Sequence, residues 1–393
     1  MIPAGSGSCS AGVLVDTCVP VHAPMLDTPC PLPPGYFMPF SALPLRLAMA
    51  LSLAPVTAAT ASSLGTSFFE HDWLLACDNT RTCRAAGFSA DAPLAFSLLL
   101  ERAGGPDTPV TAMLGYVDGA EYGDAGEKTP APRPTGALQL RVDGRALGTV
   151  VPTQPEAPAT LSQAQVEALL VALRRDAPIA IVDAAGSAWP ISNRGATALL
   201  LKMDAAQDRL DTPGALIQRG TRPESSVPPA LPRPVLKNPP PLAETRPNDV
   251  ALAERKDLMD ALLAGRDMQT VCAWQEDRVE STSLDVHRLD PVHLLASMTC
   301  LGPGYYASGP SWVIRAQPPF EPALVTTAHV FLRPPDAVLY EERDERTLGR
   351  CGFGRYWVWD GTRFVVSREY VTGLCRAMPG GFWHLATFET ELR

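Results

Sequence analysis

The residues with the clearest chemical potential are Cys77 and Cys83, which have five residues between them in the stretch from His71 to Gly87. Such a pair can bind a metal, attack a substrate or form a disulfide. A structural metal site needs about four ligands, and neither a CxxC motif nor a nearby His pair supplies the remaining ones. The choice between a reactive thiol and a disulfide depends on the compartment, because disulfides persist in oxidising ones.

The segment from Met38 to Ala61 has the layout of a secretory signal peptide. Arg46 precedes an apolar run from Leu47 to Val56, and Ala59-Thr60-Ala61 forms a small-x-small cleavage pattern. The run is shorter than the roughly 20 residues that span a bilayer, and the alternative interpretation is a buried core helix. We expect a periplasmic or secreted protein with no transmembrane span after cleavage.

Residues 1–37 are rich in Pro, Gly and Ser and do not fit a signal peptide. We interpret them as a disordered, non-native extension upstream of a true start at Met38, and residues 38–61 as the signal peptide.

The number of cysteines agrees with this interpretation. Three of the nine lie upstream of Met38, so cleavage after Ala61 leaves six, an even number as a disulfide framework requires. Six cysteines allow fifteen pairings. Proximity in sequence favours three of these bonds: Cys77–Cys83, Cys272–Cys300 and Cys351–Cys375.

A Cys77–Cys83 bond would close a small loop that contains the polar residues Asp78, Asn79 and Arg81. A covalently held loop presents its side chains rigidly, which favours recognition of a partner. The alternative is turn chemistry, because Asp and Asn tolerate tight bends. We keep these three residues as a candidate recognition loop.

No catalytic motif stands out. The sequence contains no GxSxG, HExxH, P-loop or GxGxxG pattern. His287 and His293 lie close in sequence but lack an obvious third metal ligand. We therefore assign no catalytic residue, no metal ligand and no cofactor.

Composition limits the class of partner. The 393 residues carry a net charge of −9, which disfavours binding to nucleic acid phosphates. Only 19% are charged, whereas 40 are Pro and 30 are Gly, a balance typical of short elements and many turns.

The first half reads, in chain order, as several strands, a helix, a further strand and a second helix. Strands are expected within residues 72–77, 93–103, 136–144 and 178–186. A helix should begin at a capping box of Ser162 and Gln165, and residues 195–210 should form a second helix capped by Asn193.

The second half should open with one helix over residues 249–265, ending at Gly265, and then become β-rich. Strands are expected within residues 270–275, 293–300, 311–317 and 324–332. Asp360-Gly361 lies between two β-rich runs and predicts a hairpin. The residues expected to form its cross-strand core pairs are Trp357, Trp359, Phe364 and Val366. Alternatively, the aromatic ones line a ligand groove.

Residues 221–247 are dense in proline, which excludes helix interiors and central strands. They predict a linker, or else a long surface loop, between domains at 62–220 and 248–393. The fold class is therefore α+β: two β-rich domains, each with one or two packed helices, stapled by disulfides.

Three stretches resemble the bacterial family known as domain of unknown function 1176: residues 72–88, 194–210 and 349–365. The first half also resembles the invasion-associated-locus-B domain, in which a Trp-x-x-x-Cys and a second Cys precede a strand like Arg141–Gly144. The resemblance implies a periplasmic or secreted protein and brings no catalytic residues with it.

These observations favour a non-enzymatic exported protein that binds an envelope protein, a ligand or a cell-wall component. The alternatives are an envelope hydrolase, whose carboxylate or Ser/His site is assembled only in the fold, and a purely structural protein.

Overall fold

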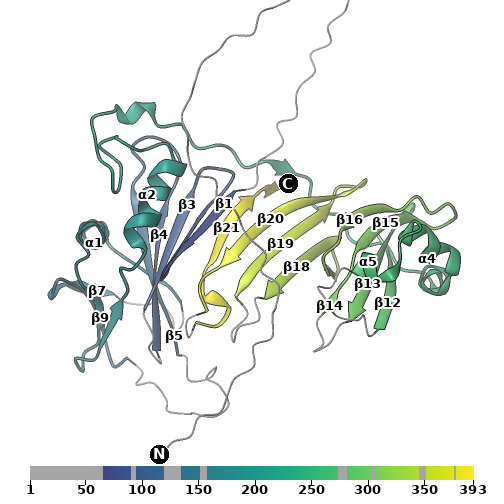
Figure 1. Cartoon of the computed structure of the whole chain (residues 1–393), viewed down its shortest axis with the longest axis horizontal. Coiled ribbons are helices and arrows are strands. Elements are labelled where there is room, and N and C mark those ends of the chain that lie inside the picture. Colours follow the sequence, from purple (N-terminus) through teal and green to yellow (C-terminus); the bar gives the residue numbers. More distant parts are fainter. Residues whose placement is uncertain are drawn as a thin grey trace, which may run out of the picture. The chain divides into compact units, whose positions relative to one another are not determined.

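The computed structural model describes residues 65–89, 94–118, 134–150, 157–272, 281–301, 307–344, 351–375 and 378–393 (Figure 1). The predicted extension 1–37 and signal peptide 38–61 lie outside these residues. All described residues group into one unit of mutual contacts, so the division into two domains stays a prediction.

The first sheet is a six-stranded antiparallel sheet that is buried on both faces. Trp73 and Leu75 pack on one face and Leu74 and Ala76 on the other, which explains the unbroken apolar run of this strand. In spatial order its strands are β1 (Thr66–Glu70), β2 (Trp73–Cys77), β3 (Cys83–Phe88), β4 (Leu94–Arg102), β5 (Val110–Asp118) and β8 (Ala159–Thr160).

Helices α1 (Gln163–Arg175) and α2 (Ala196–Ala206) cover one face of this sheet together with a smaller sheet (Figure 1). The small sheet contains, in spatial order, β10 (Ala188–Ile191), β9 (Ile179–Val182), β6 (Leu138–Val142) and β7 (Arg145–Val150). The Ser162–Gln165 capping box of α1 is confirmed. The prediction that Asn193 caps α2 is wrong: the cap residue is Gly195, because the Asn193 amide donates to Ala177 O instead.

The proline-rich segment, residues 221–247, runs in an extended path with short elements. It contains a 3-10 turn (Glu224–Ser226) and β11 (Val235–Leu236), which pairs in parallel with β22 (Glu391–Leu392) near the C-terminus. Its backbone also bonds to other parts of the chain, with Leu231 N donating to Thr80 O and Ala337 N donating to Pro240 O. Prolines prevent a continuous ladder, so the segment is attached at separate points.

The single helix predicted over 249–265 is wrong. The structure has α3 (Pro247–Val250), a 3-10 turn (Ala251–Glu254) and α4 (Lys256–Leu263), and the extended backbone of Arg255 separates the last two. Gly265 does follow α4 with a positive φ of 78°.

The predicted strand over 270–275 is also wrong in its described part. Residues 270–272 belong to α5 (Met268–Cys272), because the Asp267 side chain accepts a hydrogen bond from Thr270 N and so caps a helical turn.

Two antiparallel sheets complete the fold. One contains β12 (Ser281–Arg288), β13 (His293–Leu301), β14 (Ala307–Ser308), β15 (Ser311–Arg315) and β16 (Ala323–Thr326). The other, the β17–β21 sheet, contains β17 (Phe331–Arg333), β18 (Val338–Asp344), β19 (Gly352–Trp359), β20 (Phe364–Thr372) and β21 (His384–Glu389). The strand predicted over 324–332 is thus two strands, β16 and β17, in different sheets.

The β19–β20 hairpin predicted at Asp360-Gly361 is confirmed, with Trp357 opposite Val366 and Trp359 opposite Phe364. These residues lie on one face of the β17–β21 sheet, the packed face. There Trp357 and Trp359 pack with Leu295 of β13.

At the other end of the packed face, Val371 and Leu385 pack with Leu74 of β2. One face of the β17–β21 sheet therefore carries the contacts to both neighbouring sheets.

The molecule is β-rich with few helices and three disulfides, in agreement with the α+β class at this level. In the part of the chain that the structure describes, no helix combines the length and apolarity that membrane crossing requires.

Candidate functional site

The three disulfides join the cysteines that are neighbours in sequence: Cys77 with Cys83, Cys272 with Cys300, and Cys351 with Cys375. Cys77 and Cys83 are also direct cross-strand partners at the end of the β2–β3 hairpin. All six cysteines of the described residues are bonded, which leaves no thiol among these six for metal binding or catalysis.

The loop closed by Cys77–Cys83 is stabilised by hydrogen bonds to the side chain of one of its own residues, Asp78. Asp78 is buried, and its carboxylate accepts hydrogen bonds from Thr80 N at 2.8 Å, Thr80 Oγ1 at 2.6 Å and Thr82 N at 3.2 Å. Its other oxygen lies 2.8 Å from Arg84 Nη1. This is the turn chemistry expected of an Asp at such a position.

Asn79 and Arg81 connect this loop to distant parts of the chain. The Asn79 side-chain amide donates to Glu389 O at 3.0 Å and accepts from Glu389 N at 2.8 Å, so it pairs with β21 as a backbone group would. Arg81, with a positive φ of 69°, donates to Pro229 O at 2.7 Å. The polar groups predicted to recognise a partner therefore bond within the chain, and their recognition role remains only a prediction.

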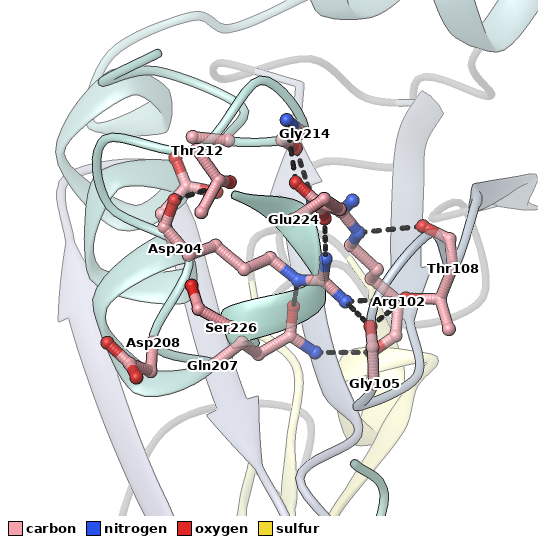
Figure 2. Close-up of polar contacts among 12 residues, drawn as sticks. Arg102, Gly105, Thr108, Asp204, Gln207, Asp208, Thr212, Gly214, Glu224 and Ser226 are labelled. Atoms are coloured by element: carbon pink, nitrogen blue, oxygen red, sulfur yellow. Dashed lines mark hydrogen bonds and ion pairs between the residues drawn. The ribbon is translucent and has the colours of Figure 1, made fainter. Parts of the chain in front are cut away.

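A buried arginine cluster lies beside this loop, at the end of α2. Arg209 is fully buried and donates to Gln207 Oε1 at 3.1 Å, Glu224 Oε1 at 2.7 Å, Thr108 Oγ1 at 2.6 Å and Gly105 O. Figure 2 shows Gln207 and Glu224 pointing toward this guanidinium group. Sequence reasoning did not find this cluster, because its members are spread over four segments.

Arg102 lies in the same cluster and donates to Thr108 O and Gly214 O (Figure 2). Burial and the nearby Arg209 lower the pKa of Arg102 to about 10. Because the polar groups of this cluster are used by one another, it anchors residues 207–227 to the β4–β5 turn and offers little to a ligand.

His293 and Asp290 form an acid–histidine pair, with Nδ1 lying 2.9 Å from Oδ2. Asp290 also accepts from Val292 N and His293 N, and its Oδ2 lies 3.2 Å from Trp359 Nε1. Within the described ranges, no hydroxyl bonds to His293 and no group of three potential ligands could hold a metal. The pair is explained by the turn between β12 and β13.

The feature that stands out on the surface is a row of rings across the β17–β21 sheet. Each of its five strands contributes one residue, and we call this set the aromatic row: Phe331, Tyr340, Tyr356, Tyr370 and His384. Successive ring centroids lie 5.2, 6.0, 6.4 and 4.3 Å apart, with interplanar angles of 19° to 30°. In Figure 1 the labelled strands β18 to β21 lie side by side, from green to yellow.

The aromatic row lies on the face opposite the packed face, because it alternates with the buried residues Leu339 and Trp357. None of the hydrophobic clusters among the described residues includes a member of the row. Phe331 is 47% exposed, His384 is exposed, and Tyr340 and Tyr356 are half-buried.

The rings overlap only in part. Stacked carbon atoms touch at about 3.5–4.0 Å, so nearly parallel rings with centroids 6.0 or 6.4 Å apart must be displaced sideways. The Tyr370 ring is buried and packs directly on Gly354, where a Cβ atom added to the glycine would come within 2.3 Å of the ring. Part of the ring face of Tyr340 and of Tyr356 therefore stays available for contact.

Basic side chains, one histidine and two arginines, accompany the row. His329 packs edge-on against Phe331 with centroids 4.6 Å apart, and burial lowers its pKa. Arg333 is exposed two residues after Phe331, and the exposed Arg368 places its guanidinium 5.3 Å from the Tyr370 ring centroid.

A shallow apolar crevice of about 470 Å³ lies beside the packed face. It is lined by Pro234 and Leu236 of the proline-rich segment, by Phe364, Val366 and Phe388 of the sheet, and by Arg363, Val365 and Thr390. Two residues of the predicted hairpin core, Phe364 and Val366, thus also border open space.

The chain matches, over residues 67–390, the family described as "Protein of unknown function (DUF1176)". It is 27% identical over 323 residues to the uncharacterized protein YpfG of Escherichia coli (strain K12), which covers 77% of this chain and 87% of that protein. No solved structure matches. Since the family model spans most of the chain, including the three disulfides and the whole aromatic row, the chain belongs to the DUF1176 family.

Proposed function

We propose that this protein is an exported, periplasmic or secreted binding protein that holds an extended glycan chain of the cell envelope on its aromatic row. The observation that carries the proposal is the row itself: one ring from each of five adjacent strands, of which Phe331 and His384 are exposed, Tyr340 and Tyr356 are half-buried and Tyr370 is buried. The likeness of residues 62–220 to the invasion-associated-locus-B domain and the removal of residues 38–61 remain predictions that agree with export.

The three disulfides support an oxidising compartment. Disulfides are rare in cytosolic proteins, where thiols are kept reduced. Six cysteines pair in this structure, and the three left over lie upstream of Met38, in the part expected to be lost.

The position of the row limits what can bind to it. Backbone groups of β18, β19 and β20 are paired on both sides, so an incoming strand cannot add to the sheet there. What the face offers instead is ring faces, tyrosine hydroxyl groups and imidazoles, repeated across the strands.

A matching ligand is long, and presents apolar patches and hydroxyl groups in alternation. Sugar rings have this character, because their C–H faces pack on aromatic rings while their hydroxyl groups hydrogen-bond at the edges. A proline-rich peptide is the competing ligand, since such peptides also dock on aromatic side chains.

The test is binding of the purified, oxidised protein to isolated cell-wall glycan and to soluble polysaccharides, followed by calorimetry. Tyr356→Ala and Tyr340→Ala should each weaken binding about tenfold, because each removes a stacking surface. Phe69→Ala is the matched control, as Phe69 is an aromatic residue 59% exposed on β1, outside the row.

Glycan binding that both tyrosine variants leave unchanged would contradict the proposal. So would a wild-type protein that binds a proline-rich peptide but no glycan. Release of sugar fragments during the assay would favour the envelope hydrolase instead.

A further inference from the structure

We infer that His329 makes glycan binding on the aromatic row sensitive to pH, because this side chain fixes Phe331, the first ring of the row, only while it is uncharged. This inference rests on the proposed function and adds the regulation of the same site. It comes from the position of His329, which contacts the row on one side and a different sheet on the other.

His329 lies in the link between two sheets. Residues 327–330 connect β16, in one sheet, to β17, the three-residue edge strand of the β17–β21 sheet. Val330 packs in the core between these sheets, whereas Phe331 is 47% exposed at the start of the row. A short edge strand has few backbone hydrogen bonds, so the side chains beside it contribute strongly to its local order.

The imidazole ring of His329 has a partner in each sheet. It packs edge-on against the Phe331 ring, with centroids 4.6 Å apart and an interplanar angle of 88°. Its Nε2 lies 3.4 Å from Thr299 Oγ1 of β13. Edge-to-face packing restricts the orientation of both rings, so His329 fixes the ring at the first position of the row.

The uncharged form of His329 suits this position. Burial lowers the pKa of His329, and the nearby carboxylate of Asp285 on β12 opposes this shift only in part. The other groups that face the imidazole, the Thr299 hydroxyl and the Phe331 ring, are uncharged. Because Asp285 is exposed, water screens its charge and it cannot fully compensate an imidazolium at this site.

The direction of the pH effect follows from the lowered pKa. A His329 side chain turned outward into water would have the ordinary pKa of about 6.5, which is higher than the pKa of the packed ring. As the pH falls through about 6.5, the outward form takes up protons first, and the packed form is lost progressively. Phe331 then loses its edge contact, and the glycan loses an ordered ring at one end of the row.

The test measures the affinity for isolated cell-wall glycan by calorimetry, from about pH 7.5 to about pH 5. The wild-type affinity should fall about threefold over this range, the loss expected when one aromatic contact becomes disordered. His329→Gln keeps a hydrogen-bonding group but cannot take up a proton, so its affinity should not change with pH.

Two further histidine variants serve as controls. His287→Gln is the matched control, since His287 is an exposed histidine of β12, outside the row, and this variant should retain the threefold fall. His384→Gln removes the imidazole at the opposite end of the row, on β21. It should lower the affinity at both pH values and keep the fall between them.

A second measurement does not depend on glycan. In an NMR titration of the free protein, the ring signals of His329 and Phe331 should change with one shared midpoint below pH 6.5. Asp285→Asn should move this midpoint to a lower pH, because the carboxylate favours the charged imidazole.

A wild-type affinity that is constant over this pH range, together with loss of binding in Tyr356→Ala, would overturn this inference and leave the proposed function standing. A fall that His329→Gln retains would also overturn it, as would Phe331 signals that stay unchanged while His329 titrates. Absence of glycan binding at every pH would overturn both proposals.

Discussion

At the scale of single residues, the buried charged groups of this protein are matched to partners rather than kept free for chemistry. Arg209 donates to Gln207 in its own segment, to Glu224 and to two groups of the β4–β5 turn. Asp249 pairs with Arg288, and both are almost fully buried. A buried ion pair adds little net stability compared with apolar packing, but losing one partner is costly. This asymmetry gives two predictions.

Arg209→Met should lower the free energy of unfolding by about 3–5 kcal/mol, because Glu224 and the Gly105 carbonyl would lose their buried donor. Urea denaturation measures the change. Arg266→Gln, at an exposed position, should change it by less than about 0.5 kcal/mol. A stable Arg209→Met protein would mean that water replaces the guanidinium.

Asp249 should make the free energy of unfolding depend on pH in the acidic range. Hydrogen bonding from Arg288 lowers the pKa of Asp249 below its usual value, so the unfolded chain takes up this proton first as the pH falls. Its contribution is complete above the unfolded pKa of about 3.9 and is lost as the pH falls through the lower, folded pKa.

The double variant Asp249→Asn/Arg288→Met removes both partners and should lose this part of the acid dependence. Urea midpoints measured from pH 6 to pH 3 should therefore fall less steeply for the variant than for the wild type. Identical slopes would show that other carboxylates dominate.

At the scale of elements, some features could be predicted from the sequence because their signals are local. The capping box of Ser162 and the hairpin at Asp360-Gly361 depend on residues only a few positions apart. The break at Arg255 and the helical turn capped by Asp267 were missed, because apolar spacing in those stretches suits more than one element.

The aromatic row could not be predicted in this way. The five rings of the row become neighbours only through the register of four strand pairs, and a shift of one residue would move any of them to the packed face. The sequence offered one partial signal, the alternation around Trp357 and Trp359, but this pattern marks the opposite face.

Gly354→Ala tests how closely the row is packed. The added Cβ would lie 2.3 Å from the Tyr370 ring, so Tyr370 must move and the row must lose its order. Overpacking of this kind costs about 1–3 kcal/mol. We expect a lower melting temperature together with weaker glycan binding, whereas Phe69→Ala should leave glycan binding intact.

At the scale of the whole molecule, the proline-rich segment and the Cys77–Cys83 loop connect early and late parts of the chain. Asn79 pairs with β21, Leu231 bonds to the loop, and β11 pairs with β22. Contacts of this kind join segments more than 150 positions apart in sequence, so they cannot be predicted from a local sequence pattern.

Export gives the prediction that belongs to this scale. Cell fractionation should recover the protein outside the cytoplasm with a mature start near Ser62, and mass spectrometry without reduction should find three disulfides. The control is an Arg46→Glu variant, whose altered leader should retain the chain in the cytoplasm. Cytosolic protein with six alkylated cysteines would contradict the prediction.

The hydrogen bond from Gly65 N to Thr387 O, at 2.9 Å, brings the first described residue to within six positions of the last one, Arg393. In the mature chain that we propose, which would begin near Ser62, ends that lie this close can be joined by a short peptide, and new ends can then be opened at an exposed turn such as Asp360–Arg363. Circular permutation is therefore open to this protein, and it would place a reporter or a surface anchor at the β19–β20 turn while leaving the sheets in their present order.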